Sequence, residues 1–241
     1  MAYKPQPVLR IYIPKPGSQK QRPLGIPTLE DKLVQAGLVR ILQAIYEQDF
    51  LDDSYGFRPL RSCHDALCAL SETVENQPIH YLVEADIKGF FDNVNQGQLI
   101  KFISHRIADK RILIQRFLKA GIQEDGQHKA SETGTPQGGV ISPLLANIYL
   151  HYTLNLWIEK CIKRKCKGYA RLIRYADNYV VCFQIEAEAK HFKEAMETRL
   201  KKFNLEVAPE KTKLFEFGVF AQSKAKARGE RLSRVHALQL T

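Results

Sequence analysis

Residues 171–183 read Arg-Leu-Ile-Arg-Tyr-Ala-Asp-Asn-Tyr-Val-Val-Cys-Phe, two apolar runs that flank a short polar turn. This pattern predicts a β-hairpin with Asp177 at its tip. A second acid, Asp86, directly follows the largely apolar run of residues 81–85, so we expect it at the end of another strand. The two acids are distant in the sequence and meet only through the fold. Carboxylates held rigidly at strand ends favour a Mg²⁺ site, because this hard ion prefers oxygen ligands and bound phosphates.

The composition indicates a globular chain with an anionic partner. Its 241 residues are 44% hydrophobic, which is sufficient for one large domain or two small ones. The net charge of +10 is concentrated in three clusters, within residues 1–29, 160–174 and 224–234. Any one cluster is explained equally well as a solvated face, but three together favour a nucleic acid over a membrane surface.

The cysteines and the apolar runs bear on the compartment. Five cysteines are an odd number without a paired framework, which suggests free thiols in a reducing compartment. No apolar run has the length of a signal peptide or of a membrane span. We therefore expect a cytoplasmic protein with no membrane partner.

Helical and strand patterns alternate without the regular repeat of a Rossmann domain. They predict an α+β fold, with a central antiparallel sheet and helices packed on one face. Apolar stripes at helical spacing, through Leu33 over residues 29–50 and around Phe192, are expected to be core. The Asp125-Gly126 pair predicts a hairpin turn. After Gln222 the chain is polar and basic, so we expect a frayed tail.

Six short motifs follow one another along the chain. They are Arg22-Pro-Leu-Gly-Ile-Pro27, Tyr55-Gly-Phe-Arg-Pro59, Ala85-Asp-Ile-Lys-Gly-Phe-Phe-Asp92, Thr135-Pro-Gln-Gly-Gly139, Tyr175-Ala-Asp-Asn178 and Pro209-Glu-Lys-Thr-Lys213. The series resembles the reverse transcriptases, most closely the group II intron type, over residues 8–220. This resemblance implies a polymerase fingers-and-palm fold. It places the fingers, with part of the fingers–palm junction, in residues 1–80, the palm with a residual fingers segment in 81–222, and a basic tail in 223–241.

The resemblance also implies an activity. A reverse transcriptase of a group II intron-type retroelement adds dNTPs to the 3′ end of a DNA primer on an RNA template. Asp86 and Asp177 match the two palm acids that bind two Mg²⁺ ions, and Ile87 supplies a backbone carbonyl. One ion lowers the pKa of the primer hydroxyl and the other stabilises the leaving pyrophosphate. Taken singly, each acid is also explained as a turn or cap residue.

Further matches to the family concern the nucleotide. Phe91 falls at the sugar gate, where an aromatic ring excludes a 2′-hydroxyl, although core packing is the alternative. Gln137 matches the dNTP-contacting glutamine, and Gly138 allows the backbone to approach a substrate closely. Lys15 and Arg22 match the basic fingers positions that hold the triphosphate, for which arginine is suited by its bidentate geometry. A solvated basic arm is the alternative for these two residues.

Two further cations have roles that the sequence leaves open. Lys211 stands where the family often has a lysine near the pyrophosphate, which makes it a candidate general acid. A surface lysine explains it equally well. Arg58, in the motif Tyr55-Gly-Phe-Arg-Pro59, either braces the fingers or touches the template.

The chain departs from the family pattern in ways that lead to three interpretations. The usual motif has a second acid where this chain has Asn178, so we expect weakened metal binding. No thumb follows the last motif, and both ends look truncated. The chain is therefore a polymerase core, a maturase-like remnant that binds intron RNA and has lost polymerisation, or one half of a split enzyme that needs a thumb-bearing partner chain.

Overall fold

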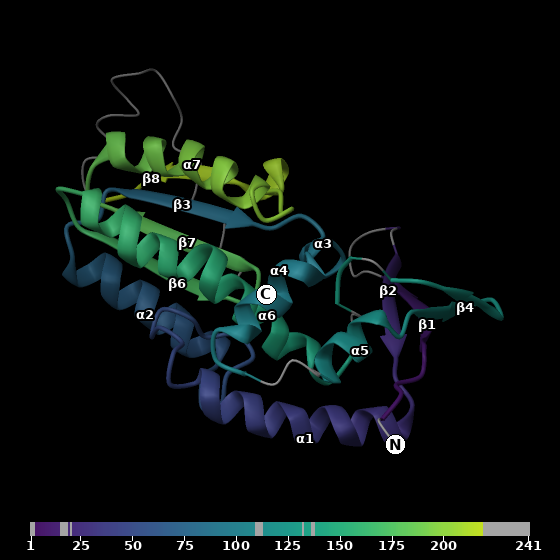
Figure 1. The fold of residues 1–241 in the computed structure, drawn as a ribbon. Helices are drawn as coiled ribbons and strands as arrows, with labels where there is room; N and C mark the ends of the chain where they lie inside the picture. Colours follow the sequence, from purple (N-terminus) through teal and green to yellow (C-terminus); the bar gives the residue numbers. More distant parts are fainter. Residues whose placement is uncertain are drawn as a thin grey trace. The chain divides into compact units, whose positions relative to one another are not determined.

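A computed structural model describes residues 3–14, 19, 21–108, 113–131, 133–135 and 138–218. The chain forms two compact units, each built from two segments (Figure 1). The first unit comprises Met1–Asp49 and Gly89–Tyr149, and the second comprises Phe50–Lys88 and Leu150–Thr241. Because each unit takes residues from both halves of the chain, the units do not coincide with the expected contiguous division at residue 80. The assignment of fingers and palm stays a prediction.

The first unit combines a small sheet with several helices. Its elements are β1 (Val8–Pro14), β2 (Gln21–Ile26), α1 (Leu29–Tyr46), α3 (Phe90–Asn93), α4 (Gln96–Ser104), α5 (Leu113–Lys119), β4 (Ile122–Glu124), β5 (Gln127–Lys129) and the start of α6 (Ser142–Leu150). The sheet order is β2-β1-β4-β5, with β1 antiparallel to β2 and parallel to β4. Asp125 and Gly126 both have positive φ in the β4–β5 turn, so the predicted hairpin is confirmed.

Helix α1 forms where it was predicted, but it buries a different face. The Thr28 side chain caps its N-terminus by accepting a hydrogen bond from the Asp31 N–H. Leu33 and Ile41 are 67% and 63% exposed, so the expectation that the Leu33 stripe is core is wrong. Polar residues instead occupy part of the buried face. Gln35 accepts a hydrogen bond from the Ile141 N–H at 3.2 Å, and Asp31 and Gln35 share the buried face with Leu42 and Tyr46.

The second unit is built on an antiparallel sheet in the order β6-β7-β3-β8. Its elements are α2 (Cys63–Asn76), β3 (Tyr81–Asp86), β6 (Ala170–Tyr175), β7 (Asn178–Phe183), α7 (Glu186–Lys201), a 3₁₀ turn (Pro209–Lys211) and β8 (Lys213–Glu216). The hairpin predicted around Asp177 is therefore confirmed, with Ala176 and Asp177 as its two turn residues. So is the α+β class with a central antiparallel sheet. The tail expected after Gln222 lies outside the described residues.

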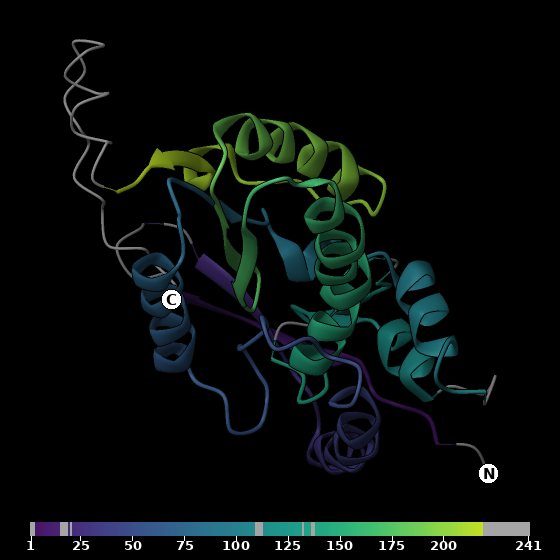
Figure 2. The same ribbon diagram turned by 90° about the vertical axis from the view of Figure 1, so that its left-hand side faces the viewer.

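Helices cover both faces of this sheet, not the one face that was expected. On one face, Ala66 and Leu70 of α2 pack with Val180 of β7. On the other, Phe183 lies with its ring centroid 5.3 Å from that of Phe192 on α7. Figures 1 and 2 both place α2 and α7 on opposite sides of the strands. The physical reason is that residues 179–183 of β7 are all apolar and alternate between the two faces, so both faces must be covered by helices.

The helix that begins at Ser142 continues with altered hydrogen bonding. After α6 come two π-helical segments, His151–Asn155 and Ile158–Ile162, and a 3₁₀ turn, Lys163–Lys165. Such π turns within a helix are rare and are frequently found at functional sites. No helix in the described part of the chain is long and apolar enough to cross a membrane.

Gly56 allows two backbones of the second unit to touch. A Cβ atom at Gly56 would lie 2.4 Å from the Ala176 nitrogen, whereas a Cβ at Gly37 on α1 would meet nothing within 4 Å. We expect Gly56→Ala to lower the free energy of unfolding by about 1–3 kcal/mol through this clash. Gly37→Ala, the matched control, should raise it by ~0.5–1 kcal/mol, because glycine is unfavourable within a helix. Urea unfolding measures both, and equal effects of the two changes would contradict the contact.

Candidate active site

The pairing of β3 with β7 brings the two predicted acids together. In the antiparallel register, Asp86 at the end of β3 lies opposite Asn178 at the start of β7. Asp177 immediately precedes Asn178 in the turn from β6. The two carboxyl groups are near enough for the charge of Asp86 to act on Asp177. Two residues that are distant in the sequence thus form one acidic site where the paired strands β3 and β7 meet the β6–β7 turn.

The electrostatics of this pair are unfavourable without a cation. Burial raises the pKa of Asp177, and the negative charge of Asp86 raises it further. The Asp177 backbone N–H, Lys211 and Arg174 act in the opposite direction. Asp86 is only 8% exposed. Two carboxylates in such surroundings repel each other, and a bound cation would relieve this repulsion.

Lys211 supplies one positive charge at this site. It ends the 3₁₀ turn Pro209–Lys211, and its Nζ donates to Asp86 Oδ2. The segment that carries it is tied to β3, since the Ala208 N–H donates to the Asp86 carbonyl at 2.8 Å. Lys211 is therefore held beside the acid pair. The observed contact is with a carboxylate, so the general-acid role stays a prediction.

The backbone at Ile87 fits the predicted ligand role. Ile87 pairs with Val207 in an isolated antiparallel bridge whose hydrogen bonds are made by the neighbouring residues. In this kind of pair, the N–H and C=O of the central residue point away from its partner. The Ile87 carbonyl is therefore directed to the side of β3 on which β7 and Asp177 lie. Its use as a metal ligand stays a prediction.

Asn178 leaves the acidic site with two carboxylates. No group of three or more His, Cys, Asp or Glu side chains that could hold a metal ion occurs among the residues described by the structure. The amide oxygen of asparagine is a neutral ligand that Mg²⁺ accepts, but it brings no charge. The site therefore offers two carboxylates, an amide and a backbone carbonyl as oxygen donors.

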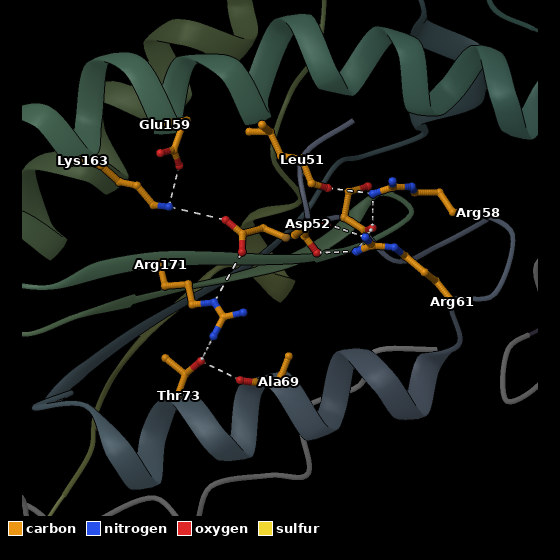
Figure 3. A network of polar contacts seen from close by, with 11 residues as sticks. Leu51, Asp52, Arg58, Arg61, Ala69, Thr73, Glu159, Lys163 and Arg171 are labelled. Carbon is orange, nitrogen blue, oxygen red and sulfur yellow. Dashed lines mark hydrogen bonds and ion pairs between the residues drawn. The ribbon is translucent and has the colours of Figure 1, made fainter. Parts of the chain in front are cut away.

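Arg58 holds together the loop that precedes α2. Arg58 is buried, and its Nη1 donates to the carbonyls of Leu51 and Ser54 at 2.7 and 2.9 Å (Figure 3). Of the two roles left open for Arg58, bracing the chain or touching the template, these contacts favour bracing. All of them are made within the second unit. Figure 3 also shows Lys163 and Arg171, each of which has an ion pair with Asp53.

The predicted nucleotide-binding residues belong to the first unit. Phe91 is half-buried on α3, with its ring edge-on to that of the fully buried Phe90 at 5.4 Å. The Thr135 N–H donates to the Phe91 carbonyl at 2.7 Å, so the glycine-rich loop begins beside Phe91. A Cβ at Gly138 would lie 2.8 Å from the carbonyl oxygen of Gly25 on β2. The first unit thus contains two of the six motifs, 22–27 and 135–139, and the end of a third, residues 89–92.

The remaining residues of this set are placed less fully. Arg22 is exposed on β2, opposite Ile13 of β1. Lys15 and Gln137 lie outside the described residues, so their predicted contacts with a dNTP stay predictions.

One group of residues near the site was missed by the sequence analysis. The side chain of Arg174 is fully buried and donates to Ser54, Asn155 and Ala176. A usable signal was present, because Arg174 is a cation inside an apolar run that reads as a buried strand. The partners gave no such signal, since serine and asparagine are common in loops and on helices.

Comparisons with known proteins agree with the geometry. The family model for reverse transcriptase (RNA-dependent DNA polymerase) matches residues 13–231. Group II intron-encoded protein LtrA of Lactococcus lactis subsp. cremoris is 53% identical over 151 residues, which cover 62% of this chain and 25% of that protein. Protein YkfC of Escherichia coli (strain K12) is 43% identical over 155 residues, which cover 62% of this chain and 40% of that protein. The chain thus spans less than half the length of either relative.

A solved structure supports the fold alone. The apo telomerase of Candida tropicalis, truncated from its C-terminal domain, matches 89% of this chain and 51% of its own with a TM-score of 0.67 and 14% identity. The fold class predicted from the sequence is therefore that of a known polymerase. With the family model covering most of the chain, the chain belongs to the reverse transcriptase (RNA-dependent DNA polymerase) family, and a group II intron-encoded protein is among its relatives.

Proposed function

We propose that the chain is the core of an RNA-directed DNA polymerase, which adds dNTPs to a DNA primer on an RNA template. The observation that carries this proposal is the juxtaposition of Asp86 and Asp177 at the ends of the central strands of the second unit's sheet. Family membership supports the reaction type. The intron-encoded relatives support intron RNA as a further partner.

The residues present fit a divalent cation. Two partly buried carboxylates repel each other, and oxygen donors from Ile87 and Asn178 flank them. When bound there, a pair of Mg²⁺ ions would activate the primer hydroxyl and stabilise the leaving pyrophosphate. Asp86 and Asp177 would hold this charge in place, because both stand at the ends of paired strands.

The other predicted residues would bind the nucleotide and supply a proton. Lys211, beside Asp86, would neutralise negative charge and give its proton to the leaving pyrophosphate. Phe91 would exclude the ribose 2′-hydroxyl, and Gly138 would let the backbone approach the base or sugar. Lys15, Arg22 and Gln137 would hold the triphosphate and the base.

One observation favours a second candidate function. Asn178 stands directly opposite Asp86, where the family's usual pattern has another acid, so the site has one negative charge fewer. A chain with weakened metal binding would act as an RNA-binding, maturase-like protein without polymerisation. The basic composition serves either function equally well.

Primer extension on an RNA template with dNTPs and Mg²⁺ separates the two functions. We expect extension by the native chain and a loss of at least about 10³-fold in Asp177→Asn, because a charged ligand is removed while the shape is kept. Asn178→Asp should extend faster at low Mg²⁺, since it restores a negative charge.

Other outcomes of this experiment would contradict the proposal. Extension by Asn178→Asp alone would overturn polymerisation as the native function and favour the RNA-binding one. Full activity of Asp177→Asn would show that the acid pair is not the reaction centre. Asp125→Asn, in the exposed β4–β5 turn, is the matched control and should extend like the native chain.

The proton-donor role of Lys211 can be separated from a charge role. We expect Lys211→Met to lower kcat by about 10²-fold, the usual effect of losing a general acid. The Mg²⁺ concentration that the Lys211→Met variant requires should not increase, because the lysine contact with Asp86 is also lost. Lys213→Met, on the neighbouring exposed lysine of β8, is the control and should leave kcat unchanged. Equal kcat values for both variants would contradict a proton-donor role.

The raised pKa of Asp177 predicts a pH-dependent stability. The folded state prefers the protonated acid, so its stabilising effect is present below the ordinary pKa of about 4 and is lost as pH rises through the raised value. In EDTA at pH 7.5, Asp177→Asn should therefore melt at a higher temperature than the native chain. The difference should shrink as the pH falls toward 4.5.

Thermal unfolding followed by circular dichroism measures this effect. Added Mg²⁺ at pH 7.5 should raise the melting temperature of the native chain more than that of Asp177→Asn. A variant that melts below the native chain in EDTA at pH 7.5 would show that the ionised acid is stabilising, against the direction of the pKa.

A further inference from the structure

The turn that carries Asp177 has a backbone conformation that needs support. Ala176 has a φ of +55°, in the left-handed region that side chains other than glycine rarely adopt. The residue forms the first half of the two-residue turn between β6 and β7, so the position of Asp177 depends on it. An alanine in this conformation persists only where surrounding contacts hold it.

The side chain of Arg174 holds this turn by a hydrogen bond to its backbone. Its Nη1 donates to the Ala176 carbonyl at 2.8 Å. Its Nε donates to Asn155 Oδ1 at 2.8 Å, and its Nη2 donates to Ser54 Oγ at 2.6 Å. The guanidinium therefore links the turn to the loop before α2 and to the first π-helical segment, all within the second unit.

The backbone makes a second set of contacts at the same place. Ser54 and Arg174 form a parallel bridge, in which the Arg174 N–H donates to the Asp53 carbonyl and the Tyr55 N–H to the Arg174 carbonyl, both at 2.8 Å. Gly56 lies against the Ala176 nitrogen, where any Cβ would clash. The loop before α2 thus contacts the turn through both its main chain and its side chains.

Burying this guanidinium is costly for the fold. Arg174 is fully buried, and Ser54 and Asn155 are each 1% exposed. Burial and, to a smaller extent, the charge of Arg58 lower the pKa of Arg174 to about 9, while Asp177 acts in the opposite direction. A buried charge is weak evidence for stability, because an apolar side chain of similar size often serves the fold as well. A role in fixing one conformation accounts for its presence better.

We propose that Arg174 is a positioning residue for the acidic site. Its guanidinium, anchored by Ser54 and Asn155, sets the place of Asp177 by holding the Ala176 carbonyl. The inference rests on the proposed function for its catalytic consequence. Its structural part, that these three side chains hold the turn, is independent of that function.

Backbone amide hydrogen exchange tests the structural part in the full chain without metal. Ser54→Ala removes one acceptor of Arg174 and should speed exchange of the amides of residues 176–178 by about fivefold, the usual effect of one lost hydrogen bond. Ser71→Ala, which removes an exposed hydroxyl bonded to Glu75 on α2, is the matched control and should leave these amides unchanged. Unchanged exchange in Ser54→Ala would overturn the inference.

A pair of variants at Asn155 separates hydrogen bonding from packing. Asn155→Leu keeps the volume and removes the acceptor, so it should speed exchange of the turn as Ser54→Ala does. Asn155→Asp keeps the acceptor and replaces Nδ2, a buried donor without a partner among the described residues, and should restore slow exchange. If Asn155→Asp exchanges as fast as Asn155→Leu, the acceptor is not what holds the turn.

Metal binding and kinetics test the catalytic part. Mn²⁺ binding followed by electron paramagnetic resonance should weaken by at least about threefold in Ser54→Ala and Asn155→Leu. In primer extension, kcat should fall while KM for dNTP is kept, because the predicted nucleotide-binding residues belong to the first unit. A loss of folded protein would instead reduce the active fraction and leave the Mn²⁺ affinity of the remainder unchanged.

The outcomes distinguish this inference from the proposed function. Faster exchange of the turn in Ser54→Ala, together with no Mn²⁺ binding by the native chain, would overturn the proposed function and leave the structural part standing. Tight Mn²⁺ binding that Asp177→Asn abolishes and Ser54→Ala leaves intact would support the function and overturn the positioning role.

Discussion

The register between β3 and β7 is the constraint on which the candidate site depends. A slip of one residue would turn every side chain of a strand to the opposite face and would separate Asp86 from the turn that carries Asp177. The register is set by burial, since Tyr179, Val181 and Phe183 face α7 while Val180 and Cys182 face α2. Packing on both faces thus determines where two mutually repelling carboxylates lie.

This packing also explains how an unfavourable site is maintained. The acid pair, the left-handed Ala176 and the buried Arg174 each raise the free energy of the folded state. Arg174, Ala176 and Asp177 lie within a few residues of one another, Asp86 lies opposite the next residue, Asn178, and the sheet beside them is apolar on both faces. The covered sheet supplies the stability that offsets them, and the loop before α2 adds backbone hydrogen bonds to the strand end. Such a concentration of costly features is typical of functional sites.

Local patterns in the sequence account for much of the fold. The hairpin at Asp177 was predictable because two β-rich runs flank a two-residue turn, and Asp125-Gly126 has the turn chemistry of its hairpin. The stripe through Leu33 misled, since periodicity reports that a helix has an apolar face but not which face finds a partner. Gln35 and its hydrogen bond to Ile141 depend on a contact between distant segments. The helix that covers the second face of the sheet was missed for the same reason.

The sequence by itself determined the ordered motifs, and through them the family, the two acids and the substitution at Asn178. Those features are readable because each depends on residue type and short spacing. Only the tertiary structure decided that Lys211 contacts Asp86, that Arg58 braces its own loop and that Arg174 joins Ser54, Asn155 and Ala176. These contacts join segments that are distant along the chain. Their geometry depends on strand register and helix packing, which no local pattern encodes.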